Sequence, residues 1–195
     1  MDTETGTNSP ALFVGDNLAL DFINTKYGID EGKRDCFVSD GSVLAWLTQA
    51  GVLVDRSSDA SSKGLLEIAV ELRKVARQLV EKRKADQWAD PSLLNRVLAL
   101  GSRHLEIQWE KGGQPTLTQK QSEEHVAAVL VPVAEALALL LAEADFEHVR
   151  KCGCEDCTLL FHDRTKSRRR RWCSMAACGN RMKVGAYRTR LKGGT

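Results

Sequence analysis

The chain has 195 residues, of which 43% are hydrophobic and 28% are charged. This composition is typical of a globular protein and excludes a wholly disordered chain. The most apolar stretch, residues 126–142, is interrupted by Pro132 and Glu135 and is short for a bilayer span, so we expect no membrane insertion. The first twenty residues lack the basic and apolar regions of a signal peptide, which favours a cytoplasmic location.

Charge is unevenly distributed along the chain. Residues 150–195 hold 13 of the 28 lysines and arginines but only three of the 26 acidic residues, a net charge of +10, whereas the other residues carry −8. Such asymmetry indicates two modules, which we place at residues 1–146 and 147–195. The basic module is expected to bind a polyanion, with nucleic acid favoured over an anionic membrane surface.

The first third of the chain predicts short helices joined by loops. Apolar residues in 17–25 fit both a strand and a helix, and we favour a helix. Residues 27–41 contain three glycines and predict a loop. Ser42 is expected to cap a short helix that ends at Gly51.

Two helices follow a polar linker at residues 57–62. Between Leu65 and Leu79 apolar residues recur every three or four positions, which predicts a long amphipathic helix. Asp90 and Pro91 predict the cap and first residue of the next helix, which is expected to end near residue 101.

A β-hairpin and an apolar helix complete this module. Residues 104–110 alternate apolar and polar side chains, and two glycines and residues 114–118 follow, which predicts a β-hairpin. Thr118 and Gln121 predict a capping box for a helix that extends to Ala144, with a kink at Pro132. The expected fold class is therefore mainly α (α+β), a helical domain with a small β-hairpin.

The helical module offers few groups for chemistry. Asp21 and Asn24 lie beside apolar residues, where they can line a site for a small-molecule or protein effector, or serve as caps or satisfied buried polar groups. We find no nucleophile–base pair, phosphate loop or open metal site in the sequence, so we expect no enzymatic activity.

Five of the six cysteines lie within 27 residues, at positions Cys152, Cys154, Cys157, Cys173 and Cys178. In a reducing compartment, clustered thiols predict metal ligands rather than disulfides. Structural zinc takes four such ligands, and two pairs joined by a hairpin-sized spacer supply them. Cys173 and Cys178 form the second pair; the first pairs Cys157 with Cys154 or Cys152, and spacing alone favours Cys154. His162 is a further candidate, although it lies in the apolar run expected to form the hairpin.

Several motifs in the chain resemble the bacterial CGNR zinc-finger family, whose finger usually follows a domain called ABATE. The finger is similar in Phe161-x-Asp163, in residues 171–175 and in Cys178-Gly179-Asn180-Arg181-x-Lys183; the helical module is similar in residues 20–25, 44–47, 72–73 and 94–95. The resemblance implies one structural zinc in a small treble-clef or ribbon-like module, held by Cys152, Cys157, Cys173 and Cys178, with Cys154 as an additional thiol. It also implies a regulator of transcription or an RNA-binding protein.

The finger carries a set of candidate nucleic-acid contacts. Phosphate contacts are expected from Lys166, Arg168, Arg169, Arg170, Arg171, Lys183, Arg188 and Arg190. Asn180 and Arg181 are residue types that read adenine and guanine edges. Alternatively, Gly179-Asn180 forms a structural turn, and Arg181 braces the zinc loop or pairs with Asp163. We therefore predict a zinc-containing DNA-binding transcription regulator; the alternatives are an RNA-binding zinc-ribbon protein and a protein–protein adaptor.

Overall fold

The computed structural model describes residues 10–28, 32–53, 62–101, 103–108, 116–121 and 125–192. Its helices are α1 (Leu18–Ile23), α2 (Asp40–Gln49), α3 (Leu65–Lys84), α4 (Ser92–Leu98), the 3-10 helix η2 (Val126–Leu130), α5 (Val131–Glu143), the 3-10 helix η3 (Phe146–His148), the π-helical turn η4 (Met175–Gly179) and α6 (Asn180–Lys192). Its strands form three antiparallel pairs: β1 (Lys26–Tyr27) with β2 (Arg34–Asp35), β3 (Arg103–Gln108) with β4 (Thr116–Gln121), and β5 (Val149–Lys151) with β6 (Leu160–His162). The expected fold class is confirmed. The linker at residues 57–61 and the glycine turn at 112–113 lie outside the described residues.

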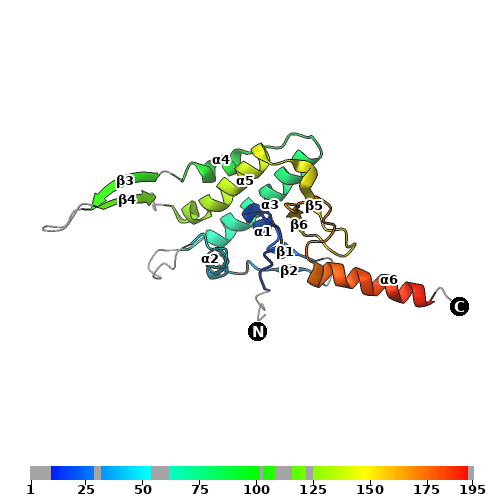
Figure 1. Ribbon diagram of the computed structural model, residues 1–195. Helices are drawn as coiled ribbons and strands as arrows, with labels where there is room; N and C mark the ends of the chain where they lie inside the picture. Colours follow the sequence, from blue (N-terminus) through cyan, green and yellow to red (C-terminus); the bar gives the residue numbers. More distant parts are fainter. Residues whose placement is uncertain are drawn as a thin grey trace, which may run out of the picture.

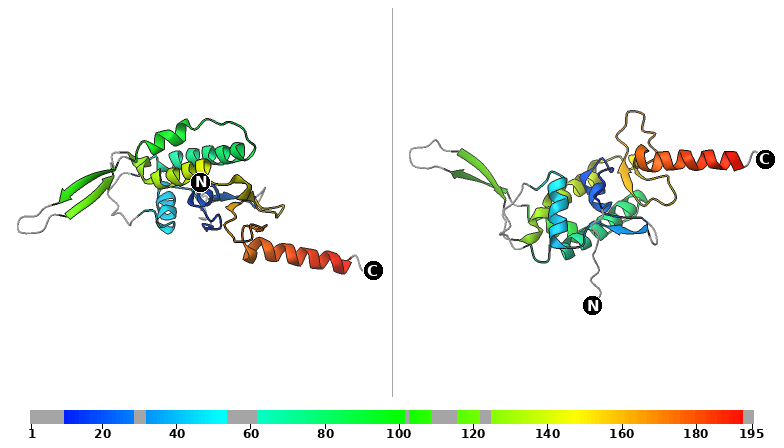
Figure 2. Two further views of the ribbon diagram at one scale, coloured as in Figure 1. Left: turned by 45° about the horizontal axis from the view of Figure 1, so that its top comes forward. Right: turned by 90° about the horizontal axis from the view of Figure 1, so that it is seen from below.

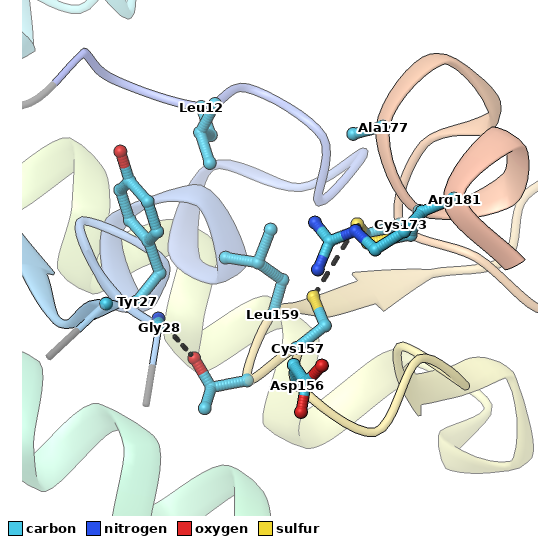
Figure 3. A pocket seen from close by; sticks show the side chains of 12 residues that line it. Leu12, Tyr27, Gly28, Asp156, Cys157, Leu159, Cys173, Ala177 and Arg181 are labelled. Carbon is cyan, nitrogen blue, oxygen red and sulfur yellow. Dashed lines mark hydrogen bonds between the residues drawn. The ribbon is translucent and has the colours of Figure 1, made fainter. Parts of the chain in front are cut away.

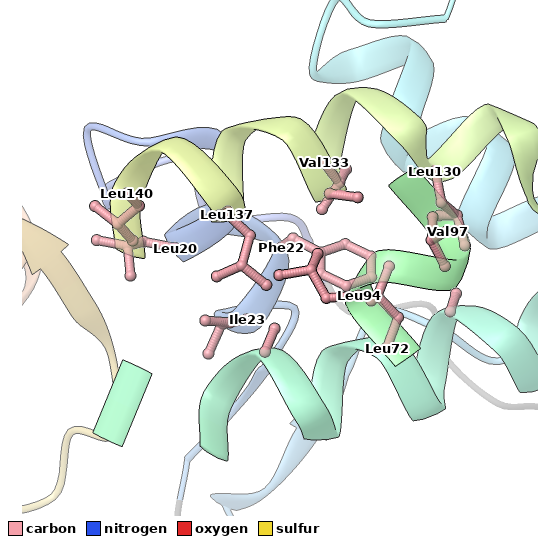
Figure 4. Packing of buried hydrophobic residues seen from close by; sticks show 14 of the residues in the cluster. Leu20, Phe22, Ile23, Leu72, Leu94, Val97, Leu130, Val133, Leu137 and Leu140 are labelled. Atoms are coloured by element: carbon pink, nitrogen blue, oxygen red, sulfur yellow. The ribbon is translucent and has the colours of Figure 1, made fainter. Parts of the chain in front are cut away.

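The short helix α1 lies at the centre of the core and packs against α3 and α5, with α4 closing the same cluster (Figures 1 and 4). Leu20, Phe22 and Ile23 are fully buried, and even Asp21 between them is buried, so this helix is enclosed on nearly every side. That explains why strand and helix patterns both fitted the sequence. The side chain of Asn17 accepts hydrogen bonds from the amides of Ala19 and Leu20, and this cap confirms the helix.

Helix α2 begins earlier than expected. Its N-cap is Ser39, and Ser42 is the third helical residue; the two side chains bond each other's backbone amides in a capping box. The prediction of Ser42 as the cap is therefore wrong by one turn, because either serine alone has the cap chemistry. The short β1–β2 pair, in a region predicted as loop, was missed because two-residue strands have no periodicity.

The apolar segment Val126–Glu143 starts later than expected. Thr118 and Gln121 lie in strand β4, so the predicted capping box is wrong, and the His125 side chain caps η2 instead. Pro132 lies in the first turn of α5, where no intrahelical partner for its amide is required, so it does not kink the helix. By length and composition this segment could cross a membrane, but its buried side packs against α1 and α4 in the core.

The β3–β4 hairpin is confirmed, although β3 begins one residue early and β4 continues to residue 121. It extends from one end of the helical body, and α6 extends from the other (Figures 1 and 2). Ile107 of this hairpin is 65% exposed. Among the described side chains, the core cluster is formed by the central helices, the segment after β2 and the β5–β6 hairpin.

The β5–β6 hairpin joins the finger to the helical core. Val149 and Leu160 belong to the same hydrophobic cluster as α1, although they lie beyond the expected boundary at residue 146. The fully buried Asn24 amide donates from Nδ2 to the Leu160 carbonyl at 2.8 Å and accepts from the Leu160 amide at 2.9 Å. The side chain of Asn24, the C-cap of α1, therefore pairs with strand β6 as a neighbouring strand would.

We predict that Asn24→Ala destabilises the protein. The change leaves the amide and carbonyl of Leu160 without their partner in a site closed to water, and we expect the free energy of unfolding to fall by about 1–3 kcal/mol. Chemical denaturation measures this change. Asn95→Ala, at an exposed position of α4, is the matched control and should change stability by less than about 0.5 kcal/mol. Equal effects of the two substitutions would contradict the structural role of Asn24.

Candidate metal centre

Four cysteines from two separate stretches of the finger converge at one point. Cys152 directly follows β5 and Cys157 precedes β6, whereas Cys173 precedes η4 and Cys178 lies within it. Their sulfur atoms all lie within 4.8 Å of one another, and all four residues are buried. The ligands therefore come from the β5–β6 connection and from the turn that starts the C-terminal helix.

The sulfur spacing fits a tetrahedral zinc site. A zinc–sulfur bond of about 2.3 Å implies sulfur–sulfur distances of about 3.8 Å in a regular tetrahedron. The Cys157–Cys173 and Cys173–Cys178 sulfur atoms lie 3.8 and 3.6 Å apart. All four thiols are free rather than disulfide-bonded. Four cysteine ligands fill the coordination sphere, so this is a structural zinc site, as the sequence indicated.

The electrostatics of this cluster favour a bound cation. A hydrogen bond from Cys173 lowers the pKa of the Cys157 thiol to about 5, whereas burial raises the pKa of Cys178 to about 12. The negative charge of one thiolate thus disfavours ionisation of the neighbouring thiols. A bound cation would offset this repulsion and allow all four cysteines to bind as thiolates. The backbone amide of Cys173 lies 3.3 Å from the Cys152 sulfur and stabilises its negative charge.

Neither of the other two candidate ligands joins the cluster. Cys154 is buried, but its sulfur is not part of the four-sulfur group, so the choice of Cys154 by spacing alone is wrong. Cys154 lies in the turn between the two ligands, where its carbonyl accepts a hydrogen bond from the Cys157 amide. His162 is a residue of β6 whose backbone amide donates to Gly15.

Asp163 organises the loop between the two ligand pairs. Its fully buried carboxylate accepts from the Thr165 hydroxyl at 2.6 Å and from the Arg170 amide at 2.8 Å. The Arg150 guanidinium lies 3.7 Å from the same carboxylate. Asp163 therefore pairs with Arg150, and the predicted alternative of an Arg181–Asp163 pair is wrong.

Arg170 is a structural residue rather than an exposed phosphate ligand. Its guanidinium donates to Asp16 and to the carbonyls of Val14, Trp172 and Cys173, and it lies 4.4 Å from the Phe161 ring centroid. These contacts occupy its donors and tie the finger to the segment before α1. The prediction that Arg170 contacts nucleic acid is therefore corrected. No local pattern marks Asp16 or Val14 as its partners, because they lie more than 150 residues away.

The other predicted contact residues are exposed. This holds for Lys166, Arg168, Arg169, Arg171, Asn180, Arg181 and Lys183; Arg188 and Arg190 lie on α6, and their side chains lie outside the described residues. Asn180 is the first residue of α6. Gly179 before it is buried, and a Cβ there would lie 2.7 Å from the Met175 sulfur and 3.3 Å from the Trp172 ring. Gly179 and Asn180 thus join η4 to α6 within one helical segment and not in a turn, and the crowding around Gly179 gives this junction a structural role.

Asp21 and Asn24 use their polar groups inside the protein. Asp21 accepts hydrogen bonds from the amides of Val14 at 2.9 Å and Gly15 at 2.7 Å. It thereby fixes the segment before α1 that contacts the Arg170 guanidinium. Neither residue lines the cavity next to the cysteines. The geometry therefore matches the satisfied buried polar groups that the sequence also allowed, and an effector site at Asp21 and Asn24 stays a prediction.

We predict one zinc per chain by elemental analysis of the purified protein. Replacing Cys152, Cys157, Cys173 or Cys178 with Ser removes one of four ligands and should release the metal. Cys154→Ser is the matched control, a buried cysteine of the same turn, and should retain one equivalent. Loss of zinc from Cys154→Ser with retention in Cys152→Ser would show that the first ligand is misassigned.

We also predict a pH dependence of stability from Asp21. Burial raises the pKa of Asp21 from 3.8 to about 6, so the folded state binds this proton more tightly than the unfolded chain. Its contribution to stability is present at low pH and is lost as the pH rises through about 6. Asp21→Asn keeps an acceptor oxygen and should raise the free energy of unfolding at neutral pH by roughly 1–3 kcal/mol. Denaturation as a function of pH measures this, with the exposed Asp86→Asn as a control; equal pH profiles for wild type and Asp21→Asn would contradict it.

Comparison with known families agrees with this geometry. A model named ABATE, with the description "Putative stress-induced transcription regulator", matches residues 16–144, and the CGNR zinc finger model matches residues 148–191. A search of curated proteins gave no match. Since the ABATE match spans more than half of the chain and the four sulfur atoms lie in the CGNR match, the chain belongs to the ABATE family and carries a CGNR zinc finger.

Proposed function

We propose that this zinc-binding protein is a DNA-binding regulator of transcription whose finger contacts the phosphate backbone. The observation that carries the proposal is a rigid loop with exposed cations. Asp163 and Arg170 hold this loop against the body, while Lys166, Arg169 and Arg171 remain exposed around it. A loop whose backbone is already held loses little backbone entropy when its cations bind phosphates, and the bound cations release counterions from the nucleic acid.

A cleft beside this loop provides a place for a phosphate. The cleft has a volume of about 410 Å³, and Arg169 and Arg171 lie on its wall with the hydroxyl residues Thr165 and Ser167. The Arg171 guanidinium lies 5.1 Å from the Trp172 ring centroid, which supports its side chain at the edge of the cleft. Guanidinium and hydroxyl groups are common donors to backbone phosphates.

Helix α6 extends this basic surface away from the body (Figure 2). It carries Lys183, Arg188 and Arg190 and has no acidic residue. A projecting helix of this kind can enter a major groove, which favours duplex DNA over the narrow major groove of an RNA helix. The acidic helical domain would be repelled by the nucleic acid, would make no contact with it, and would respond to an effector.

We predict that replacing Lys166, Arg169 and Arg171 together with Ala weakens duplex DNA binding for all sequences alike. Each lost phosphate contact should reduce the slope of log affinity against log salt by up to ~0.9. Fluorescence anisotropy in a salt titration, with duplex DNA, single-stranded RNA and an acidic protein as ligands, measures both quantities. Arg170 is left unchanged because its loss would loosen the loop.

The matched control replaces Lys63, Lys74 and Arg96, three exposed cations of the helical domain, with Ala. This variant has the same net charge as the finger variant and should retain both affinity and slope. Unchanged binding of the finger variant to DNA and RNA would contradict the proposal. Tighter binding to RNA or to the acidic protein would favour the corresponding alternative.

A further inference from the structure

Arg181 shares a cavity wall with the metal ligands. The cavity has a volume of about 420 Å³ and is lined by Cys157, Cys173 and Cys178 on one side and by residues of the segment before and after α1 on the other. Figure 3 shows the Arg181 side chain reaching from the start of α6 over the sulfur atoms of Cys157 and Cys173. The first turn of α6 thus places a guanidinium beside the zinc site.

The guanidinium has no other partner among the residues that the structure describes. Arg150 donates to backbone carbonyls of the finger loop, and Arg168 and Arg170 are bonded within the finger as well. The Arg181 guanidinium, in contrast, makes no hydrogen bond or ion pair with any described residue. Asp156 contributes an acidic side chain to the same cavity wall, but forms no ion pair with Arg181 in the described part of the chain.

The charge of the metal centre supplies the missing partner. Four thiolates and one divalent zinc carry a net charge of −2, next to a cavity that also contains the Asp156 carboxylate. A small anion would be repelled there, whereas a guanidinium is attracted. Groups around a metal that compensate its ligands in this way tune its affinity.

We infer that Arg181 is the charge partner of the zinc–tetrathiolate centre, and that it fixes the first turn of α6 to the metal. It is a positioning residue and does not read a base. Helix α6 continues directly from η4, the turn that carries Cys178, so the metal sets the direction in which the basic helix projects. The inference concerns the zinc site itself and does not depend on nucleic-acid binding.

Zinc affinity of the full chain tests this assignment. Arg181→Met keeps the apolar stem but removes the charge, and it should lower zinc affinity by about 10- to 100-fold in competition with a chromogenic chelator. Arg181→Lys restores a cation and should recover most of that loss. Lys183→Met, an exposed cation two residues further along α6, is the matched control and should bind zinc like the wild type.

Two further measurements separate this role from a general loss of structure. In the wild type, zinc affinity should fall as salt screens the Arg181–thiolate attraction, and Arg181→Lys should behave alike. The sulfur-to-metal absorption of the cobalt-loaded protein should shift in Arg181→Met but not in Lys183→Met. Unchanged zinc affinity in Arg181→Met, or failure of Arg181→Lys to recover any affinity, would overturn the inference. Unchanged metal binding with an altered base preference would identify Arg181 as a base reader instead.

Discussion

The pairing between the Asn24 side chain and the Leu160 backbone is the interaction on which the rest of this structure depends. A fully buried amide must have both of its groups bonded, and here the partner is the strand that follows the first two zinc ligands. Helix α1, which Asn24 caps, carries Asp21, and Asp21 fixes the segment whose carbonyl accepts a hydrogen bond from Arg170. The central helix of the core therefore determines where the metal-binding turn and the basic loop lie.

The basic residues of the finger divide into two groups by what surrounds them. The Arg150 and Arg170 guanidinium groups donate to backbone carbonyls and pair with Asp163 and Asp16, respectively, and they act as internal braces. Lys166, Arg169 and Arg171 have no such enclosure and remain in contact with water. A run of four consecutive arginines thus mixes structural and solvent-facing groups, and net charge alone overestimates the number that can contact a polyanion.

Sequence reasoning succeeded where one local pattern had one physical solution. The amphipathic stripe of α3 and the cysteine cluster were both predicted, since periodicity and thiol spacing act over short distances. It failed where two choices were locally equal, as for Ser39 against Ser42. The choice of Cys152 over Cys154 came from family resemblance, and the geometry of the turn confirms it. The partners of Arg170 were beyond reach, because contacts across more than 150 residues leave no trace in a single sequence.

Val149 and Leu160 lie in the main hydrophobic cluster although they belong to the finger, and this continuity limits how the protein can be rearranged. A finger transferred to another protein would carry two apolar side chains and an unpaired strand edge into water, since α1 would be missing. Fusion proteins and evolutionary shuffling would face the same penalty. The two family domains are thus separate in sequence but share one hydrophobic core, and we expect them to be retained together as one structural unit.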